Sequence, residues 1–548
     1  MTPVAADIPY HRLRAPADHG STYIDPPVSI AREMIDRNRT HIAGTELDLL
    51  GMPWADVAFA ARRELVRQAR NYTAQYRDVA PADSAPASQQ TERVLMAGHQ
   101  PQLFHAGVWF KNFALDSVAR AQDAVSVNLI IDNDVPRDCS IRVPTGNLEA
   151  PRVEHVDWAR PTNLTPYEDQ VVHDAEQFNS FGERVATSLS PLIQAPLVER
   201  IWPWAADLVR GDANPGRAIA AARHRLEGEL GLSTLELPLS RVCATSSFRQ
   251  FASHLLAHLP RLWDIYNTSL AEYRSAHSIR SQAHPVPDLR RDDEWLEAPL
   301  WIWSVADPTR RRLFARGTPD GVELTDRHHI STKLVHTADG DGQRAVEQLS
   351  ALERSGTRIR PRALITTMYV RMVLCDLFLH GIGGAKYDGL TDLFIRRFWN
   401  SEPPGFSTIS GTLLLPVRRT PAHPRDLHQV DMRLRQLRYH PEQYIALDGL
   451  SSPRERQEVE RLAASKRRAV ADQPSRGKRR ARHLEISEAN AALQPYVESQ
   501  RAKLTDQRVR LAEQVRKNVV LSSREYAFCL FPEETLVPLL LEMLPAQP

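Results

Sequence analysis

The sequence predicts an α/β protein built on a parallel sheet, with a long antiparallel coiled-coil hairpin near the C-terminus. Two observations predict this fold class. A strand, a turn, a helix and a second strand follow one another between residues 94 and 132, which is the order of a βαβ unit. Near the C-terminus, apolar residues recur at spacings of four and seven in a charged background, as they do in paired helices.

Length and composition are those of a globular protein that buries a sizeable core. The chain has 548 residues, of which 42% are hydrophobic and 25% are charged, so two or three structural units, or one core with large insertions, are expected. The 69 basic and 67 acidic residues leave a net charge of +2, which does not indicate nucleic-acid binding. Four cysteines without C-x-x-C spacing predict neither a disulfide framework nor a zinc site.

The N-terminal part, residues 1–90, is expected to be a helical segment followed by a linker. Apolar positions three to four residues apart predict helix over 28–78, and the Pro/Ala/Ser-rich stretch 79–90 reads as an exposed connector. No apolar run is long enough to span a bilayer, and the first residues lack the apolar stretch of a signal peptide. The sequence therefore predicts a cytoplasmic protein with no membrane partner.

The βαβ unit opens a core that we expect to cover residues 91–423. Its strands are predicted at 94–97 and 125–132, with the helix at 108–122. Residues from about 140 to 350 are interpreted as insertions and further α/β units, with an aromatic segment at 297–305. Ligands of parallel α/β sheets bind at the carboxyl ends of the strands, which is where two polar loops fall.

The first polar loop, inside "MAGHQPQLFHAGVWFK", follows the first strand. It carries two glycines, two histidines, two glutamines and a lysine: Gly98, His99, Gln100, Gln102, His105, Gly107 and Lys111. Glycines let a ligand approach backbone amides, histidines serve as acids, bases or phosphate donors, amides fix a ligand, and a lysine neutralises charge. The alternative is a capped turn with a solvent-facing lysine.

Two further segments carry polar side chains in a pattern that indicates a site. Asp132, Asn133 and Asp134 follow the second strand and are suited to orienting an amine, acting as a base or holding Mg²⁺, although an Asx-rich turn is the alternative. The glycine-rich "HGIGGAKYDG" at 380–389 is either a close approach to a ligand or a plain tight loop. Its candidate binding residues are His380, Gly381, Gly383, Gly384, Lys386 and Tyr387, with Asp388 beside them.

The coiled-coil hairpin is expected over 424–522, and the apolar tail 523–548 should pack back on the core. The turn of the hairpin is strongly basic, with Arg476, Lys478, Arg479, Arg480 and Arg482. Such a charge run is either a solvated face or a site for phosphate or a protein partner. The hairpin could also support a homodimer.

These motifs, taken in order, resemble the cysteine-adding enzyme of bacillithiol biosynthesis, the bacillithiol synthase family. The resemblance depends on "GHQPQLFHAG", "DND" after a strand, "RPRALITTMY" leading into "HGIGGAKYDGL", a coiled-coil hairpin and a short apolar tail. It implies a Rossmann-like core with insertions, a ligand cleft built from the three loops, and amide formation between cysteine and a glucosamine-malate amine.

The chain departs from the family pattern at several of these positions. His99 stands where the family has glutamine, Asn133 replaces a histidine, and Gly384 replaces an acidic residue. The sequence His105-Ala106-Gly107 takes the place of Thr-Gly-Pro. The family's substrates are therefore not carried over to this chain.

The leading hypothesis is a ligase that forms a carbon–nitrogen bond, joining an amino acid such as cysteine to the amine of a small metabolite such as an amino-sugar conjugate. Its expected catalytic residues are His99 and His105, which activate a phosphate or carboxylate, and Asp132 and Asp134, which hold the amine. ATP is expected because amide formation in water is uphill, and Mg²⁺ is possible as its companion.

Two other classes stay open. One is a non-catalytic binding protein that uses the basic tip of the hairpin for a partner or a nucleic acid. The other is a metal-assisted hydrolase that uses His99, His105 and the aspartates. No metal ligands are assigned, and His328 and His329 are adjacent on an expected strand, so they point to opposite faces.

Overall fold

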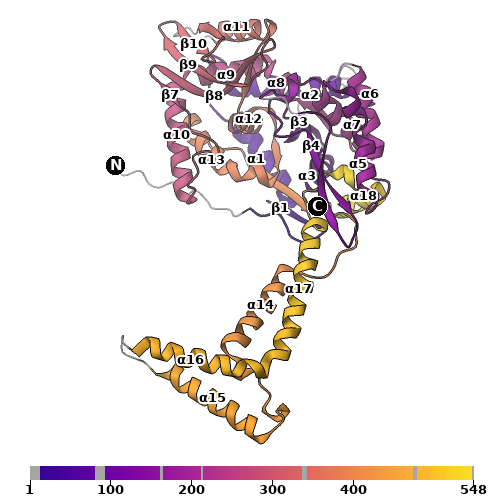
Figure 1. Cartoon of the computed structure of the whole chain (residues 1–548). Helices are drawn as coiled ribbons and strands as arrows, with labels where there is room; N and C mark the ends of the chain where they lie inside the picture. Colours follow the sequence, from indigo (N-terminus) through magenta and orange to yellow (C-terminus); the bar gives the residue numbers. More distant parts are fainter. Residues whose placement is uncertain are drawn as a thin grey trace. The chain divides into compact units, whose positions relative to one another are not determined.

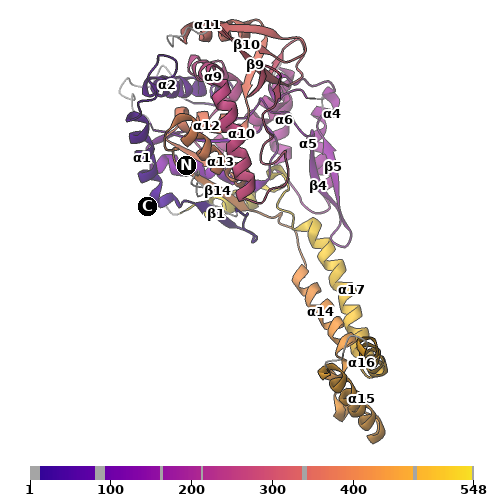
Figure 2. The same cartoon turned by 90° about the vertical axis from the view of Figure 1, so that its left-hand side faces the viewer.

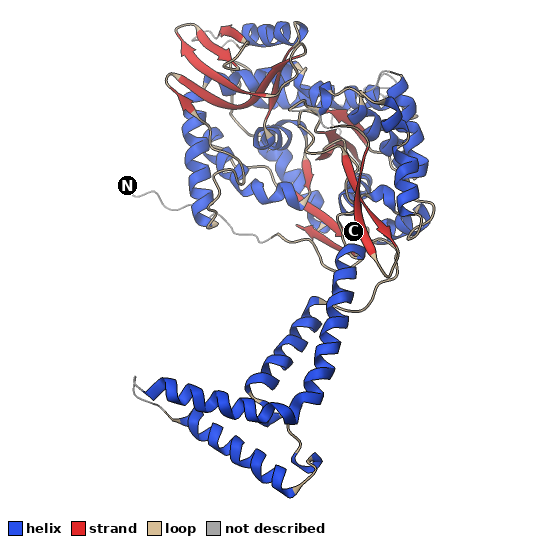
Figure 3. Cartoon of the chain, in the orientation of Figure 1, coloured by secondary structure: helices blue, strands red, loops and turns tan. Residues whose placement is uncertain are grey.

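The computed structural model describes residues 13–79, 93–160, 164–211, 214–335, 342–472 and 478–545. Two compact units make up the chain. Unit 1 consists of residues 1–145, 154–416 and 524–548, and unit 2 consists of residues 146–153 and 417–523. Almost all of the expected connector at 79–90, and Arg476 of the basic tip, lie outside the described residues. Helices and strands alternate along the described chain, so the fold is mixed α/β (Figures 1 and 3).

A six-stranded sheet forms the centre of unit 1. Its strands, in spatial order, are β1 (Ser21–Asp25), β14 (Phe406–Thr412), β13 (Leu377–His380), β2 (Arg93–His99), β3 (Ala124–Ile130) and β6 (Leu235–Pro238). Only β1 is antiparallel, and the other five strands are parallel. The predicted βαβ unit is confirmed as β2, α3 (Ala106–Ala121) and β3.

Both faces of this sheet are covered. Val94 and Met96 of β2 belong to a hydrophobic cluster that also contains the inward face of α2 (Trp54–Thr73). Leu95 and Ala97 are equally buried but lie outside that cluster. Because neighbouring strand residues point to opposite faces, they face the other side of the sheet, and α3 contacts β2, β3 and β14. β2 is therefore a central, doubly covered strand, as its apolar sequence requires.

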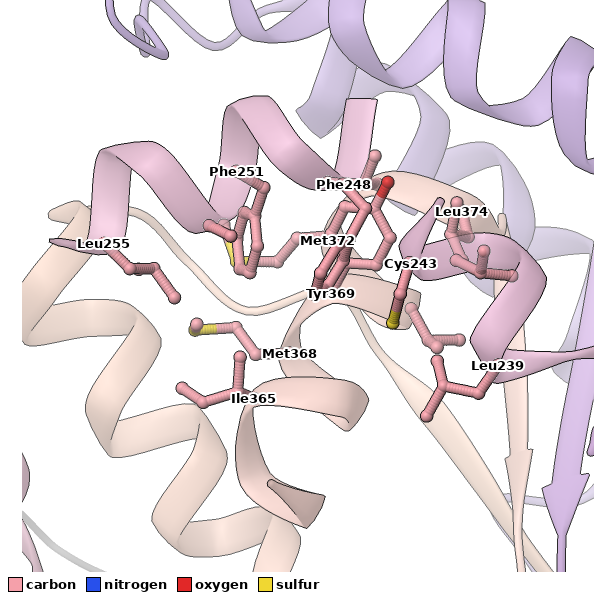
Figure 4. Close-up of a cluster of buried hydrophobic side chains, with 14 of the residues drawn as sticks. Leu239, Cys243, Phe248, Phe251, Leu255, Ile365, Met368, Tyr369, Met372 and Leu374 are labelled. Carbon is pink, nitrogen blue, oxygen red and sulfur yellow. The ribbon is translucent and has the colours of Figure 1, made fainter. Parts of the chain in front are cut away.

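The largest cluster of apolar side chains joins segments far apart in the sequence. In Figure 4, α9 (Ser246–Ala257) and α12 (Ala363–Tyr369) bring Phe248, Phe251, Met368 and Tyr369 together. The Tyr369 ring centroid lies 5.3 Å from that of Phe248 and 4.9 Å from that of Phe251. The remaining helices of unit 1 are α1 (Ala31–Ala43), α4 (Ala175–Asn179), α5 (Phe181–Leu189), α6 (Val198–Arg210), α7 (Pro215–Glu229), α8 (Leu239–Cys243), α10 (Leu259–Ala276), α11 (Gln343–Arg354), α13 (Ile382–Trp399) and α18 (Glu533–Glu542).

Residues 140–350, interpreted from the sequence as insertions and further α/β units, contribute one strand, β6, to the central sheet. Most of the remaining strands of this region belong to a separate antiparallel sheet: β7 (Arg291–Asp292), β8 (Trp295–Ser304), β9 (Arg311–Thr318), β10 (Gly321–Thr325), β11 (Ser331–Val335) and β12 (Thr357–Pro361). The short connections between β8, β9, β10 and β11 leave no room for crossover helices, so these neighbours pair antiparallel. β4 (Ser140–Gly146) and β5 (Pro151–Asp157) form a third, two-stranded sheet.

Four helices make up most of unit 2, where the sequence predicted two long ones. They are α14 (Pro424–Tyr439), α15 (Pro453–Ala471), α16 (Arg479–Leu493) and α17 (Glu498–Leu521). α14 pairs with α17 and α15 pairs with α16, as the views in Figures 1 and 2 agree. The expected second helix is divided by a short 3₁₀ turn that contains Pro495, a residue that cannot donate to the helical ladder.

Local contacts fix the ends of the α15–α16 pair. Ser452 and Glu455 form a capping box at the start of α15. At its other end, Arg482 donates hydrogen bonds to the carbonyl oxygens of Ala469 and Val470, at 2.7 and 2.8 Å. One cation of the basic tip therefore caps the neighbouring helix.

Hydropathy along the helices bears on membrane insertion. Within the described ranges, no helix combines the length and the apolar character that crossing a membrane requires.

Candidate functional site

Three parallel strands of unit 1 end side by side at one edge of the central sheet. The register pairs His99 of β2 with Ile130 of β3, and Leu379 of β13 with Ala97 of β2. His380 therefore ends β13 at the level of Gly98. The loops that follow these strands, beginning at residues 100, 131 and 381, thus leave from the same edge. The strand order reverses between β2 and β13, and such a reversal is where open parallel sheets bind ligands.

Lys111 is a buried cation near this reversal. It lies on α3, is 4% exposed, and its ammonium donates a hydrogen bond to the carbonyl oxygen of Gly98 at 2.6 Å. No carboxylate of the described residues lies within ion-pair distance of it. Burial lowers the Lys111 pKa to about 8, and the positive charge of Arg223 adds to the effect. The ammonium therefore has donors and charge to offer an anion.

The glycine-rich segment after β13 is the first turn of α13 rather than a free loop. Gly381 is the N-cap residue, and no side chain caps the helix there. A methyl group added at Gly381 or at Gly383 would meet no atom within 4 Å, so both glycines face open space. The exposed amides at a helix start carry a partial positive charge that favours anions.

Gly384 has a different role from its neighbours. A side chain there would overlap the imidazole of His380, so the ring lies against the first turn of α13. His380 Nε2 is 3.1 Å from Oδ2 of Asp388, which lies on the same helix. Burial raises the Asp388 pKa to about 6, and burial together with the charges of Lys111 and Arg371 holds the His380 pKa well below 6.5.

Two residues of the second loop have internal partners in the fold. Asp132 accepts hydrogen bonds from the backbone amide of Ser240 at 2.9 Å and from its hydroxyl at 2.5 Å, which ties β3 to the start of α8. Burial raises the pKa of this carboxyl. Asn133 donates to the carbonyl oxygen of Pro361 at 2.7 Å. The structure thus gives Asp132 and Asn133 structural bonds in place of the expected contacts with a substrate.

Asp134 is the most exposed of the three candidates in this loop, although it too has partners. Its side chain is 37% exposed and lies 2.8 Å from Arg310 of the segment before β9. The amide of Gln100 donates to Asp134, and Gln102 donates in turn to Gln100. This chain of side chains joins the loops after β2 and β3 and leaves a carboxylate at the sheet edge.

The two candidate histidines of the first loop are both held inside the fold. His99 is 8% exposed, and its ring centroid lies 4.7 Å from that of Phe104. Burial keeps the His99 pKa well below 6.5, so the imidazole is neutral. His105 caps α3, because its Nδ1 accepts a hydrogen bond from the amide of Gly107 at 3.1 Å, and burial lowers its pKa to about 4. The expected activating role of His105 is therefore replaced by helix capping.

Other candidates of the sequence analysis are placed by backbone geometry. A side chain at Gly107 would overlap the carbonyl oxygen of Gly411, so this glycine allows α3 to approach β14 closely. Lys386 is exposed, and its carbonyl oxygen accepts a hydrogen bond from the hydroxyl of Tyr273 at 2.5 Å. The Tyr387 ring lies 6.1 Å from that of His284. Neither Lys386 nor Tyr387 has a contact that indicates a ligand.

Sequence reasoning missed an arginine–tryptophan stack beside Asp134. The guanidinium carbons of Arg310 and Arg362 lie 4.4 and 4.2 Å from the ring centroid of Trp301. Arg362 is buried, and two of its nitrogens have no hydrogen-bond partner in the described part of the chain. The only sequence signal was the aromatic segment at 297–305. Arg362 reaches Trp301 because β12 pairs with β8, and this pairing joins segments that are far apart in the sequence.

A second buried polar cluster lies around α7. Glu227 accepts hydrogen bonds from Trp109 at 2.7 Å, Asn112 at 2.8 Å and Arg223 at 2.6 Å. Among the described residues, His224, Glu227 and Glu236 are the one group close enough to share a metal ion. Arg223 already pairs with both carboxylates, so the cluster is better understood as an ion network. The hydrolase hypothesis required His99, His105 and the aspartates, which form no such group in the described ranges.

Comparisons with known proteins add no assignment. No protein-family model matches the chain, and no curated protein sequence matches it either. The arrangement of side chains at the sheet edge is therefore the basis for any inference about function.

Proposed function

We propose that this chain is a ligase that forms a carbon–nitrogen bond on a Rossmann-like sheet, in the manner of the bacillithiol synthases. It joins an amino acid such as cysteine to the amine of a small metabolite such as an amino-sugar conjugate. The strand order β14-β13-β2-β3-β6 supports the Rossmann-like assignment, because the first parallel strand is central and its successors extend to either side.

The buried, unpaired ammonium of Lys111 is the observation that carries the proposal. Keeping such a charge away from water without a counter-ion is unfavourable, and an anionic ligand would remove that penalty. The uncapped start of α13 provides a second positive feature at the same sheet edge, next to Gly381 and Gly383. A phosphate or a carboxylate suits this combination.

Nucleotide binding follows from the chemistry that the proposal assigns. Amide formation in water is uphill, so the carboxylate must be activated, and ATP is the donor that we propose. Its phosphates fit the lysine and the glycine amides, and Mg²⁺ would accompany them. The partly exposed carboxylate of Asp134 is placed to hold the positively charged amine of the acceptor.

The test is a search for the condensation product. It compares the loss of the Lys111 charge with the loss of a lysine charge elsewhere on the chain. The purified chain is incubated with ATP, single amino acids and amine acceptors such as glucosaminyl-malate, and condensation products are detected by mass spectrometry. We expect a product that depends on ATP and on one amino acid, and its loss in Lys111→Met. Lys386→Met, which removes an exposed lysine of α13, should retain activity. The proposal fails if no amino acid stimulates ATP consumption or if Lys111→Met behaves as wild type.

A further inference from the structure

We propose that His380 and Asp388 form the proton-accepting pair of the reaction, which takes the proton from the attacking amine. This inference rests on the proposed ligase function and adds the group that its chemistry needs. An amine attacks a carbonyl carbon only after losing its positive charge, and a positioned base accelerates that step. Three features of the structure support this assignment: the position of the imidazole, the placement of its second nitrogen and the charges around it.

The pair is assembled by the turn from β13 into α13. His380 is the last residue of β13, and Asp388 lies in the second turn of the helix that follows. The ring packs edge-on against Phe378, with centroids 4.7 Å apart, and Gly384 leaves the space that it occupies. His380 Nε2 and Asp388 Oδ2 then lie 3.1 Å apart. The short strand and the glycine together fix the imidazole at the sheet edge.

The second nitrogen of the ring, Nδ1, lies against Gly384 in the first turn of α13. An ionised Asp388 accepts the proton on Nε2, so the lone pair is on Nδ1. Nδ1 has no hydrogen-bond partner among the described residues, and a side chain at Gly384 would overlap it. It therefore faces the first turn of α13, where Gly381 and Gly383 border open space. Nε2 is fully buried, so the 13% of the side chain that is exposed belongs to other atoms.

Charged groups from three elements surround the pair. Lys111 faces it from α3, Arg371 from the turn before β13, and Asp392 from α13. Arg371 lies 3.6 Å from Asp388 and 2.7 Å from Asp392. Burial, together with the two cations, lowers the His380 pKa and keeps the imidazole neutral, and above about pH 6 the Asp388 carboxyl is ionised. A neutral histidine beside a carboxylate is the form that accepts a proton.

Several polar atoms of the pair and of its neighbour Arg371 lack hydrogen bonds. Asp388 Oδ2, His380 Nε2 and two nitrogens of Arg371 are buried without a well-formed hydrogen bond in the described structure. Asp132, by contrast, has both oxygens bonded to Ser240. Buried polar groups are normally satisfied, and exceptions concentrate where chemistry needs them.

The proposed step balances as follows. The amine nitrogen attacks the carbonyl carbon of the activated amino acid, and a carbon–nitrogen bond forms. The bond from that carbon to its phosphate leaving group breaks, and the leaving group keeps the electron pair. His380 Nδ1 takes the proton whose loss neutralises the ammonium before attack, and Asp388 stabilises the imidazolium through Nε2. The second nitrogen-bound proton, lost as the amide forms, leaves with the phosphate.

The experiment compares two carboxylates that contact the same arginine. Asp388→Asn should lower kcat at least about 100-fold, while Asp392→Asn, which does not face the imidazole, should stay within about threefold of wild type. Wild-type kcat should rise as the pH passes about 6, and the residual rate of Asp388→Asn should not. Melting temperatures establish that each variant is folded.

A second variant keeps the test decisive if Asp388→Asn does not fold. His380→Ala should lose activity to a similar extent and recover at least about tenfold with added imidazole, which replaces the missing base. Equal activity of the two asparagine variants, or an unchanged pH profile with no rescue, would overturn this inference while leaving the ligase intact. Absence of any wild-type condensation product would instead remove the proposed function, and this inference with it.

Discussion

Replacing Lys111 by methionine should stabilise the folded chain at pH 7, although it removes the cation on which the proposed anion site depends. Burial lowers the Lys111 pKa from 10.5 to about 8, and this difference corresponds to about 3 kcal/mol of unfavourable free energy for the charged form. The substitution also removes the 2.6 Å hydrogen bond to Gly98, and this loss lowers the stability of the variant by about 1–2 kcal/mol. The net gain should therefore be about 1–2 kcal/mol.

The sign of the effect changes with pH. The folded pKa of Lys111 lies below its unfolded value, so between about pH 8 and 10.5 the unfolded chain binds more protons than the folded chain. Wild type therefore gains stability as the pH rises through this window, and Lys111→Met does not. Near pH 10 the lysine is neutral in the folded chain and most of the penalty is gone, so the variant should be the less stable protein.

Urea unfolding of wild type and variant measures the difference in their free energies of unfolding at pH 7 and near pH 10. The difference between the two proteins at each pH cancels the titration of all other groups. Lys386→Met is the matched control, because it removes an exposed lysine and should change stability by less than about 0.5 kcal/mol. If Lys111→Met destabilises the fold equally at both pH values, the buried ammonium is not an unfavourable charge, and the argument for an anion site loses its basis.

Three further predictions concern single residues. Gly384→Ala should displace the His380 imidazole and lower kcat at least about tenfold, and an unchanged kcat would show that the ring is not held there. His105→Ala should cost about 1 kcal/mol in urea unfolding by removing the cap of α3, while His105→Asn retains most of it; equal loss would argue against capping. Arg223→Met should cost about 3–5 kcal/mol in thermal unfolding, because it leaves Glu227 without its counter-charge, and a small effect would mean that the carboxyls are protonated.

The βαβ unit was predictable because its signals are local. β2 and β3 are apolar runs, α3 has a helical pattern, and each is bounded by polar or glycine residues. β14 and β1 were not predicted, since serine, threonine and glycine dominate β14, and its strand character comes from pairing with β13 and β1. The division of the second long helix at Pro495 was also missed, although proline is a clear signal there.

The position of the candidate site was predictable, but the roles of its residues were not. Polar loops after parallel strands had to meet at one sheet edge, and the register places them there. Whether a given polar side chain is already hydrogen-bonded within the fold depends on partners that are distant in the sequence. Asp132 is bonded to Ser240, and Asn133 to Pro361, across 108 and 228 residues. The importance of Asp388 likewise appears only when the helix brings it to His380.

Saturation of hydrogen bonds distinguishes the polar residues of this edge that the fold alone explains from those to which the proposed function assigns a ligand or a reaction step. His105 and Asp132 each hold the start of a helix with well-formed bonds, so the fold alone explains them. Lys111 and Asp388 are equally buried, but one lacks a counter-ion and the other lacks a well-formed bond on one oxygen. Each such group costs about 1–3 kcal/mol, which is a large part of the stability margin of a protein. Because folding gains nothing from these costs, we infer that the compensation comes from a bound molecule.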